Sequence, residues 1–481
     1  MADEQSGERA RPRAVLVATL SVLRPRIRAA VSTAARPLFI RRARRSGGAD
    51  PTHWGLEPND GDMSIGSASL RSLVEQHGSP LHVVDATRLR AQMESVAVHD
   101  IVLAAAHRCT HVTGVLDMVR ASGCWIATSS QYELEAAVAA GVDVSEVLHA
   151  PAAMSVTEFD RLSALQLGVL VVPSLASLPQ RPASVDAANS DDATRLGLTI
   201  AVDDVAGALD RLQEFDGATR ARITHLHVRA SQQRRLVTEL GDVAERVAAV
   251  WKGAVEWLEL SSLSVEMDVI PPSVALVGGV DARLNQAFGR PVSGAEENGP
   301  PLAELLRDFI RGIGEAGVCT DDVIVDPGSI VTGGQQFTLA TVLEVDDSRS
   351  PTHVVLDCGI NVADDTLVER HELFVARSNR SANHDRPLKP HRLVGPICTP
   401  ADVLYSNWWM APVEAGDVVA IMDTGGPYVA ESTTFSFPRP AVISVDERGA
   451  SAVLRDAETF DDLVALDSFE PATSGDSYLS P

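Results

Sequence analysis

Two histidines, His225 and His227, are separated by one residue in a segment whose alternation is typical of a β-strand. Alternation places both imidazoles on one face of that strand, where they could bind a metal ion. We find no matching third ligand in the sequence, so we predict no metal site. His227 remains open to two interpretations: a pocket residue that contacts a ligand, or a core residue held by hydrogen bonds.

Arg108 and Arg229 form a second candidate pair. A guanidinium presents a planar fork of donors that matches carboxylates and phosphates, so two arginines in one pocket could bind a small anionic ligand. The alternative is that they form ion pairs within the protein, because a buried charge without a partner is costly. Cys398 also has two interpretations, a reactive thiol or a small apolar residue at an interface.

Strands that alternate with helices must position these side chains. Eight strand candidates follow one another, and Ala- and Leu-rich segments of helical period lie between most of them. Repeated strand–helix units imply a parallel sheet, and about eight of them imply an α/β fold of the (β/α)8 barrel type. The candidates are residues 101–106, 124–128, 147–150, 169–172, 196–202, 223–228, 257–260 and 323–325.

The pattern changes after Gly334. Strand-like segments at 337–345, 353–357, 417–422 and 441–445 are separated by turn residues, without a long helical pattern, which predicts an all-β domain. The expected division is a basic, disordered arm at 1–50, a lead-in segment that packs with the β domain at 51–80, the barrel at 81–335, the β domain at 336–470 and a disordered tail at 471–481.

The charge of the chain limits its function. The 481 residues carry a net charge of −24, which argues against nucleic-acid binding because such proteins carry a basic surface. The first 48 residues differ, since they hold eleven arginines and three acidic residues. This arm could be disordered, could make weak contact with an anionic membrane, or could contact an acidic partner. The five cysteines are scattered without a CxxC pair, which indicates a reducing, cytoplasmic location.

Six segments resemble, in order, motifs of the fold-type III decarboxylases of diaminopimelate, ornithine and arginine, which use pyridoxal phosphate (PLP). The family motifs are GTPLYVYD, GELELALAAGV, HxH, EPG, GPLCESGDVL and DAGAY, and their counterparts are residues 79–85, 131–142, 225–227, 326–328, 395–404 and 423–428. Each match is weak alone, but the shared order is specific. The resemblance implies an alanine-racemase-like barrel, a C-terminal β domain, and subunits that pair head to tail with active sites at the interface.

The residue that holds the cofactor is missing from this pattern. In the resembled family, PLP forms a Schiff base with a lysine amine on a barrel strand. The resemblance places that lysine at Arg108, or at His107 with a shift of one residue. An arginine stays protonated and a histidine has no primary amine, so neither can form this bond. The chain has only two lysines, Lys252 and Lys389, which lie in a predicted helix and a predicted loop.

Other cofactor contacts are partly retained. By resemblance, His227 would stack on the PLP ring and Asp326 would face the pyridine nitrogen. Ser231 and Tyr428 would lie near the phosphate, although both are out of register with the family motifs. The family's glycine-rich LDLGGG turn aligns with residues 258–263, where side chains occupy the space that glycine leaves open.

Two further residues match the family near the predicted interface. Cys398 corresponds to the family's cysteine, which acts across the subunit interface, and Asp402 corresponds to the aspartate that follows it. The scaffold and the pairing mode therefore resemble the family more closely than the cofactor site does.

These observations favour a catalytically inactive homologue that needs no cofactor and acts as a binding or regulatory subunit. We expect it to form a homodimer, or a heterodimer with an active paralogue. The alternative is an active PLP-dependent decarboxylase of a basic amino acid such as diaminopimelate, ornithine or lysine. A third possibility, an enzyme that works without PLP, has little support in the sequence.

Overall fold

The computed structural model describes residues 49–59, 61–97, 102–178, 194–230, 237–276, 300–320, 322–367, 369–377 and 388–468. Most of the predicted arm at 1–50, the predicted tail at 471–481 and the candidate phosphate contact Ser231 lie outside the described residues.

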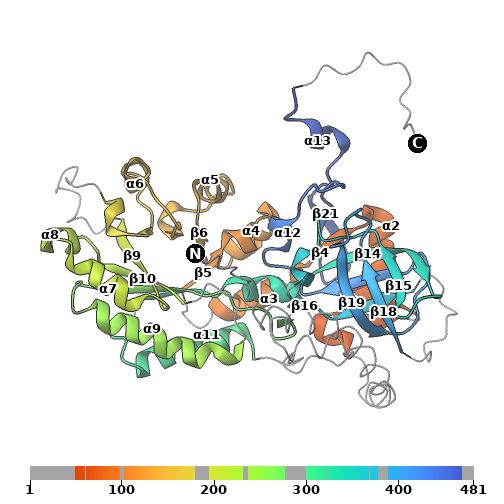
Figure 1. Cartoon of the computed structure of the whole chain (residues 1–481), viewed down its shortest axis with the longest axis horizontal. Coiled ribbons are helices and arrows are strands. Elements are labelled where there is room, and N and C mark those ends of the chain that lie inside the picture. The colour runs from red at the N-terminus through yellow and green to blue at the C-terminus, as the bar shows by residue number, and fades with distance from the viewer. Residues whose placement is uncertain are drawn as a thin grey trace, which may run out of the picture.

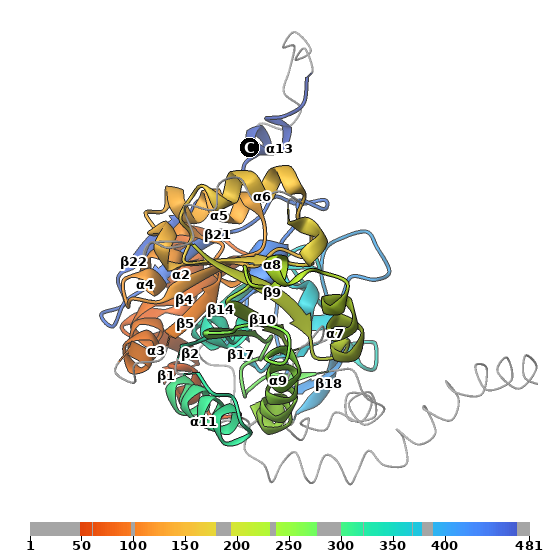
Figure 2. The same cartoon turned by 90° about the vertical axis from the view of Figure 1, so that its left-hand side faces the viewer.

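Eight parallel strands close into a barrel in the order β10-β11-β13-β5-β6-β7-β8-β9, which confirms the predicted fold (Figure 2). Their bounds are β5 Val102–Ala106, β6 Trp125–Thr128, β7 Val147–His149, β8 Val169–Val172, β9 Arg195–Ala201, β10 His225–Arg229, β11 Ser262–Glu266 and β13 Val323–Asp326. The described helices of the barrel segment are α3 Ala86–Ala97, α4 Thr113–Arg120, α5 Gln131–Ala139, α6 Val156–Ser163, α7 Val205–Gln213, α8 Gly217–Arg220, α9 Leu240–Ala254 and α11 Leu302–Glu315.

The predicted strand at 257–260 is wrong. These residues form the connection after α9, and β11 begins at Ser262. Trp257 is 36% exposed and the Arg220 guanidinium stacks over its ring, so its apolar character reflects a surface contact. The true strand carries Ser262 and Ser264, which are buried polar residues and lack an apolar alternation signal.

The second domain is a nine-stranded sheet built mainly from the C-terminal part of the chain, on the right in Figure 1. Its strands are β4 Leu81–Asp85, β14 Gln336–Asp346, β15 Thr352–Leu356, β17 Leu373–Ala376, β18 Lys389–Val394, β19 Val403–Met410, β20 Val418–Met422, β21 Ala441–Val445 and β22 Ser451–Arg455. Because β4 pairs with β14 and β21, it belongs to this sheet. The barrel strands therefore begin after the predicted boundary at residue 81.

The lead-in segment joins the core of the β domain. It contains the 3-10 turn η1 Pro51–Trp54, a small sheet of β1 Glu57–Asn59, β2 Asp62–Ile65 and β3 Ala68–Ser69, and helix α2 Leu70–His77. Trp54 and Leu70 pack in one apolar cluster with Phe337 of β14. A further pair of short strands, β12 Ala275–Leu276 and β16 Glu369–Arg370, links a barrel loop to the β domain. The two domains are therefore connected at several points along the chain.

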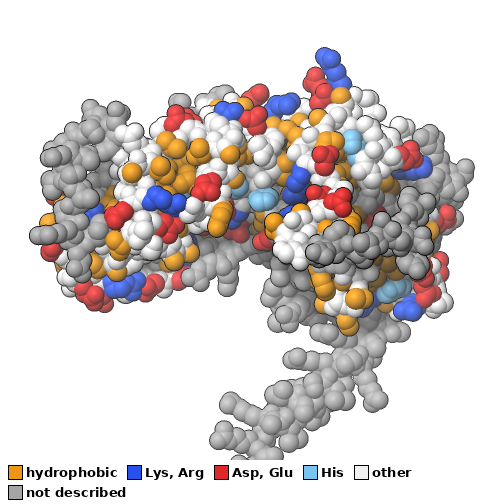
Figure 3. Space-filling model, turned by 90° about the horizontal axis from the view of Figure 1, so that it is seen from above, with side chains coloured by type: hydrophobic (Ala, Val, Ile, Leu, Met, Phe, Trp, Pro, Cys, Tyr) orange, Lys and Arg blue, Asp and Glu red, His pale blue; other side chains and the backbone are white. Residues whose placement is uncertain are grey.

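The carboxyl ends of several barrel strands face the β domain. The turn η2 His107–Cys109 follows β5, and the turns η7 Gly328–Val331 and η8 Gly333–Gln335 follow β13. The short helix α12 Tyr428–Glu431 contacts η2 and lies between the domains in Figure 1. On the face shown in Figure 3, acidic and basic side chains of the described residues are interspersed over both domains. The last described helix, α13 Phe460–Val464, stands away from the body.

Candidate functional site

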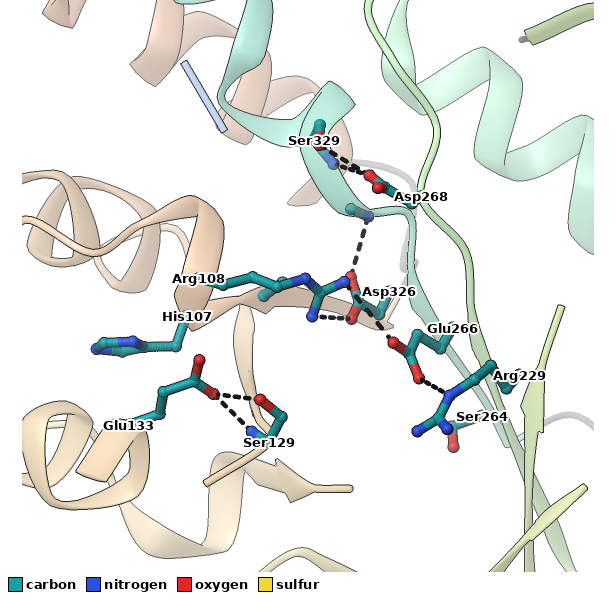
Figure 4. A network of polar contacts seen from close by, with 12 residues as sticks. His107, Arg108, Ser129, Glu133, Arg229, Ser264, Glu266, Asp268, Asp326 and Ser329 are labelled. Atoms are coloured by element: carbon teal, nitrogen blue, oxygen red, sulfur yellow. Dashed lines mark hydrogen bonds and ion pairs between the residues drawn. The ribbon is translucent and has the colours of Figure 1, made fainter. Parts of the chain in front are cut away.

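Four charged side chains meet where barrel strands end, which is where active sites of (β/α)8 proteins lie (Figure 4). Each is positioned by a different strand: Arg108 by the turn after β5, and Arg229, Glu266 and Asp326 by the last residues of β10, β11 and β13. The barrel thus brings together residues that are far apart in the sequence.

The charges form a connected network. Arg108 lies between two carboxylates, with Nη1 3.7 Å from Asp326 Oδ2 and Nη2 3.8 Å from Glu266 Oε1. Arg229 Nε donates to Glu266 Oε2 at 3.0 Å, and His227 Nε2 lies 3.3 Å from the same oxygen. Both arginines therefore have acidic partners within the protein, as the ion-pair interpretation expected.

The pKa values of the two carboxyl groups, Asp326 and Glu266, shift in opposite directions. Burial raises the pKa of the Asp326 carboxyl to about 7, although the Arg108 charge acts in the opposite direction. Burial also acts to raise the pKa of Glu266, but the hydrogen bond from His227 and the charges of Arg229 and Arg108 hold it well below its usual range. Glu266 is therefore ionised at neutral pH, whereas Asp326 keeps its proton to a much higher pH than an ordinary aspartic acid.

A hydrogen-bonded chain runs from this network into the barrel. His225 contacts Ser262 Oγ and Ser264 Oγ at 2.7 Å each, and Ser264 Oγ lies 2.8 Å from His227 Nδ1. Burial lowers the pKa of His225 well below its usual range, so this imidazole is neutral. A consistent donor direction runs from Ser262 through both histidines to Glu266. All four ring nitrogens thus have partners, and the histidines have the contacts of hydrogen-bonded core residues.

The partners of these histidines were not predicted from the sequence. Strands β10 and β11 pair in parallel register, with His225 opposite Ser262, His227 opposite Ser264 and Arg229 opposite Glu266. The signal was present as two segments of matching period, His-x-His-x-Arg and Ser-x-Ser-x-Glu. It becomes visible only when β11 is placed correctly.

The alignment of the glycine-rich turn is also wrong. Residues 258–263 precede β11 or begin it, so they lie at the amino end of the strand. Its carboxyl end carries Glu266, Met267 and Asp268. Asp268 Oδ1 accepts hydrogen bonds from Ser329 Oγ at 2.8 Å and from Ser329 N at 3.4 Å. Two acidic residues therefore border the mouth at this strand.

Cys398 and Asp402 lie apart from this network, in a turn before β19. Cys398 is exposed, whereas Asp402 is buried. The Asp402 carboxylate accepts from Ile360 N and Ile397 N at 2.8 Å each. A Cβ on Gly395 would lie 2.4 Å from that carboxylate, so the close approach requires glycine. Asp402 fixes the shape of the turn that presents Cys398.

His107 and Tyr428 flank the mouth without joining the network. His107 points away from Asp326, toward the side of Glu133 (Figure 4). Tyr428 is buried in α12, and its hydroxyl contacts His371 Nε2, while His371 Nδ1 donates to Met422 O. Of the predicted cofactor contacts, the structure brings together His227 and Asp326, beside Arg108, which stands at the position expected for the Schiff-base lysine.

The two lysines lie outside the mouth. Lys252 is an exposed residue of α9. Lys389 begins β18 in the β domain and pairs with Asp347. No lysine side chain therefore reaches the position of Arg108.

Comparison with known proteins identifies the scaffold. Residues 81–425 match the family described as "Pyridoxal-dependent decarboxylase, C-terminal sheet domain". The chain is 25% identical over 442 residues to the diaminopimelate decarboxylase of Mycobacterium tuberculosis, covering 85% of this chain and 95% of that protein.

Solved structures share the fold. The diaminopimelate decarboxylase structure from M. jannaschi superimposes with a TM-score of 0.68 at 15% identity, covering 86% of this chain and 98% of that one. A lysine/ornithine decarboxylase from Vibrio vulnificus, complexed with cadaverine, gives a TM-score of 0.59 at 20% identity, covering 78% of this chain and 97% of that one. Because the family match extends over most of the barrel and the β domain, this chain belongs to the pyridoxal-dependent decarboxylase family.

Proposed function

We propose that this chain is a non-catalytic member of its family, which works by binding, as a regulatory subunit, and does not use PLP. The observation that carries the proposal is Arg108, whose guanidinium lies between Asp326 and Glu266. By family resemblance this residue stands where a lysine amine would bond PLP. Its charge occupies the approach to Asp326, the carboxylate expected to face the pyridine nitrogen.

The surroundings of Arg108 also do not suit PLP. A phosphate group binds most readily where backbone N–H groups and positive charge converge. Here Asp268 occupies two donors of Ser329, and Glu266 occupies Arg229. A small anionic ligand, the other binding candidate for the arginines, would likewise have to displace Glu266. The residues present therefore do not fit the cofactor.

The retained scaffold supports a role in association. The turn that carries Cys398 is held by a buried aspartate although Cys398 itself is exposed. In the resembled family this cysteine acts across the subunit interface. We propose that the chain forms a dimer, with itself or with an active relative, through this face of the β domain. The free cysteines suit the cytoplasmic location expected from the sequence.

The alternative is an active decarboxylase of diaminopimelate, lysine or ornithine, which the names of the relatives favour. One experiment separates the two. The purified full chain is incubated with PLP, reduced with borohydride and analysed by intact mass, and carbon dioxide release is measured from each of the three amino acids. We expect no covalent adduct and no release. An adduct on Lys252 or Lys389 together with turnover would contradict the proposal.

The association itself needs a separate measurement. Sedimentation of the purified chain, alone and mixed with an active decarboxylase from the same host, reports homodimers and heterodimers. We expect a dimer in at least one of the two samples. A monomer in both would refute the regulatory role, and would do so independently of the PLP result.

A further inference from the structure

A cavity lies between the lead-in segment, the barrel and the β domain, and its volume is about 180 Å³. It is bordered by η1, α3, the segment after β11, the start of α11, η7 and η8, and the turn after β20. Among the described residues that line it, none belongs to the network of Arg108. It is therefore distinct from the barrel mouth.

Asp423 contributes a buried carboxylate to this cavity and is 3% exposed. Its Oδ2 atom accepts from Trp54 Nε1 at 2.8 Å and from Ser273 Oγ at 2.7 Å. Its Oδ1 atom has no hydrogen-bond partner among the residues that the structure describes. Gly334, another lining residue, leaves space beside it, since a Cβ there would lie 3.6 Å from Oδ1. One oxygen of a buried carboxylate thus remains available to a ligand.

The backbone of Asp423 is also unusual. Its φ angle is +58°, in the left-handed region that side chains other than glycine rarely adopt. The surrounding contacts with Trp54 and Ser273 hold the residue in this conformation. Such strain persists where the structure fixes a side chain in one orientation. Here that orientation directs the carboxylate to the cavity wall.

Arg88 of α3 contributes the opposite charge. Its Nη2 atom donates to His53 O at 3.1 Å, which anchors the guanidinium to η1. The Arg88 charge acts to lower the pKa of Asp85 and that of Asp423, but no carboxylate of the described residues forms a direct ion pair with it. A guanidinium has five donors; one of them contacts His53 O, and Arg88 is itself a lining residue of the cavity.

The other lining residues include two glutamines that bond one another and four prolines. Gln335 Nε2 donates to Gln92 Oε1 at 2.9 Å, and Gln92 Nε2 donates to Val331 O at 2.6 Å. Pro271, Pro272, Pro300 and Pro301 form part of the wall and have no N–H donor. His53 also lines the cavity, and the acidic and basic side chains among the lining residues are Arg88 and Asp423.

We infer that this cavity binds a small zwitterion, whose carboxylate pairs with Arg88 and whose ammonium group pairs with Asp423. Opposite charges on one ligand satisfy both residues at once, whereas a simple anion or cation would satisfy only one. The volume equals roughly six water molecules at about 30 Å³ each, which suits a ligand the size of a small amino acid. This inference does not depend on whether the barrel mouth binds PLP.

Calorimetry on the intact protein tests the inference with defined probes. Glycine, β-alanine and 4-aminobutyrate vary the spacing between the two charges, while acetate and methylammonium each supply only one. We expect at least one zwitterion to bind, and acetate and methylammonium to bind at least tenfold more weakly. The inference is wrong if none of the three zwitterions binds, or if acetate binds as tightly as the best of them.

Variants assign the binding to this cavity. Asp423→Asn keeps an acceptor for Trp54 but removes the charge, and Arg88→Gln removes the cation without changing Asp423. Each should weaken zwitterion binding at least tenfold. The matched control Arg90→Gln, at an exposed position of the same helix, and Arg108→Met in the barrel mouth should leave it unchanged. If Asp423→Asn does not fold, Arg88→Gln decides, and unchanged binding in that variant would overturn the inference.

Discussion

Two buried aspartates that match family motifs, Asp326 and Asp402, are held in different ways. Asp326 at the barrel mouth faces the side chains of Arg108 and Glu266 and accepts one backbone bond from Gly328 N at 3.0 Å. Asp402 in the β domain accepts two backbone N–H groups that belong to two separate turns. Neighbouring side chains thus make most of the contacts to the Asp326 carboxylate. The contacts to the Asp402 carboxylate come instead from backbone N–H groups.

This difference explains which parts of the family pattern persist. Side chains at the barrel mouth can change together, because the strands that carry them are held by ladder bonds and an apolar core. The turn around Asp402 has no such freedom, since Gly359 and Gly395 leave space only for that carboxylate. A scaffold can therefore keep its shape while the side chains at its barrel mouth change.

The largest expected effect is at Asp402. Asp402→Ala leaves Ile360 N and Ile397 N without their acceptor in a buried turn, and we expect a loss of about 4 kcal/mol in the free energy of unfolding. Urea denaturation measures this loss. Asp402→Asn keeps one acceptor oxygen and should lose about half as much. A loss below about 1 kcal/mol for alanine would show that the turn does not depend on the carboxylate.

Asp326 should make the free energy of unfolding depend on pH. Its pKa is about 7 in the folded protein against an ordinary 3.8, so the folded state binds the extra proton between these values. The contribution of Asp326 to stability is therefore full below about pH 4 and falls as pH rises to about 7, by on the order of 3 kcal/mol. Asp326→Asn cannot titrate, so its stability should lack this fall. Parallel pH profiles of the two proteins would contradict the assignment.

Arg108 should show a smaller loss that depends on pH. Arg108→Met removes the cation shared by Asp326 and Glu266, and we expect a loss of about 2 kcal/mol at pH 8, moderated because the arginine side chain is 34% exposed. The loss should shrink at pH 5, where Asp326 is protonated. The variant also removes a charge that lowers the pKa of Asp326, so that pKa should rise above about 7. Arg108→Lys, which keeps a charge, should lose less at pH 8.

Periodic features were predictable from the sequence, and contacts between distant segments were not. The barrel and the β domain follow from alternation and helical spacing, which are local signals. Strand β11 was misplaced because its buried face carries Ser262 and Ser264, whose role is set by histidines 37 and 39 residues away. Glu266 was missed for the same reason. Arg108 was identified because a motif fixed its position along the chain.

The cavity around Asp423 lay beyond sequence analysis for a further reason. Its two charged residues, Arg88 and Asp423, are more than three hundred positions apart and come from α3 and the turn after β20. No periodicity links them, and only the pairing of β4 with β14, and of β14 with β20, brings those elements together. Which atoms of these two side chains lack a hydrogen-bond partner can be determined only from the structure.

The smallest effect is expected at Cys398, the exposed residue of the turn that Asp402 holds. Cys398→Ser should change the free energy of unfolding by less than about 0.5 kcal/mol, because an exposed side chain contributes little to packing. Thiol labelling of the native monomer should modify Cys319 and Cys398, since the other three cysteines are buried. If the chain dimerises through this turn, labelling of Cys398 should slow with rising protein concentration while Cys319 is unaffected. Equal rates for both thiols at every concentration would exclude the turn from the interface and leave Asp402 with a purely structural role.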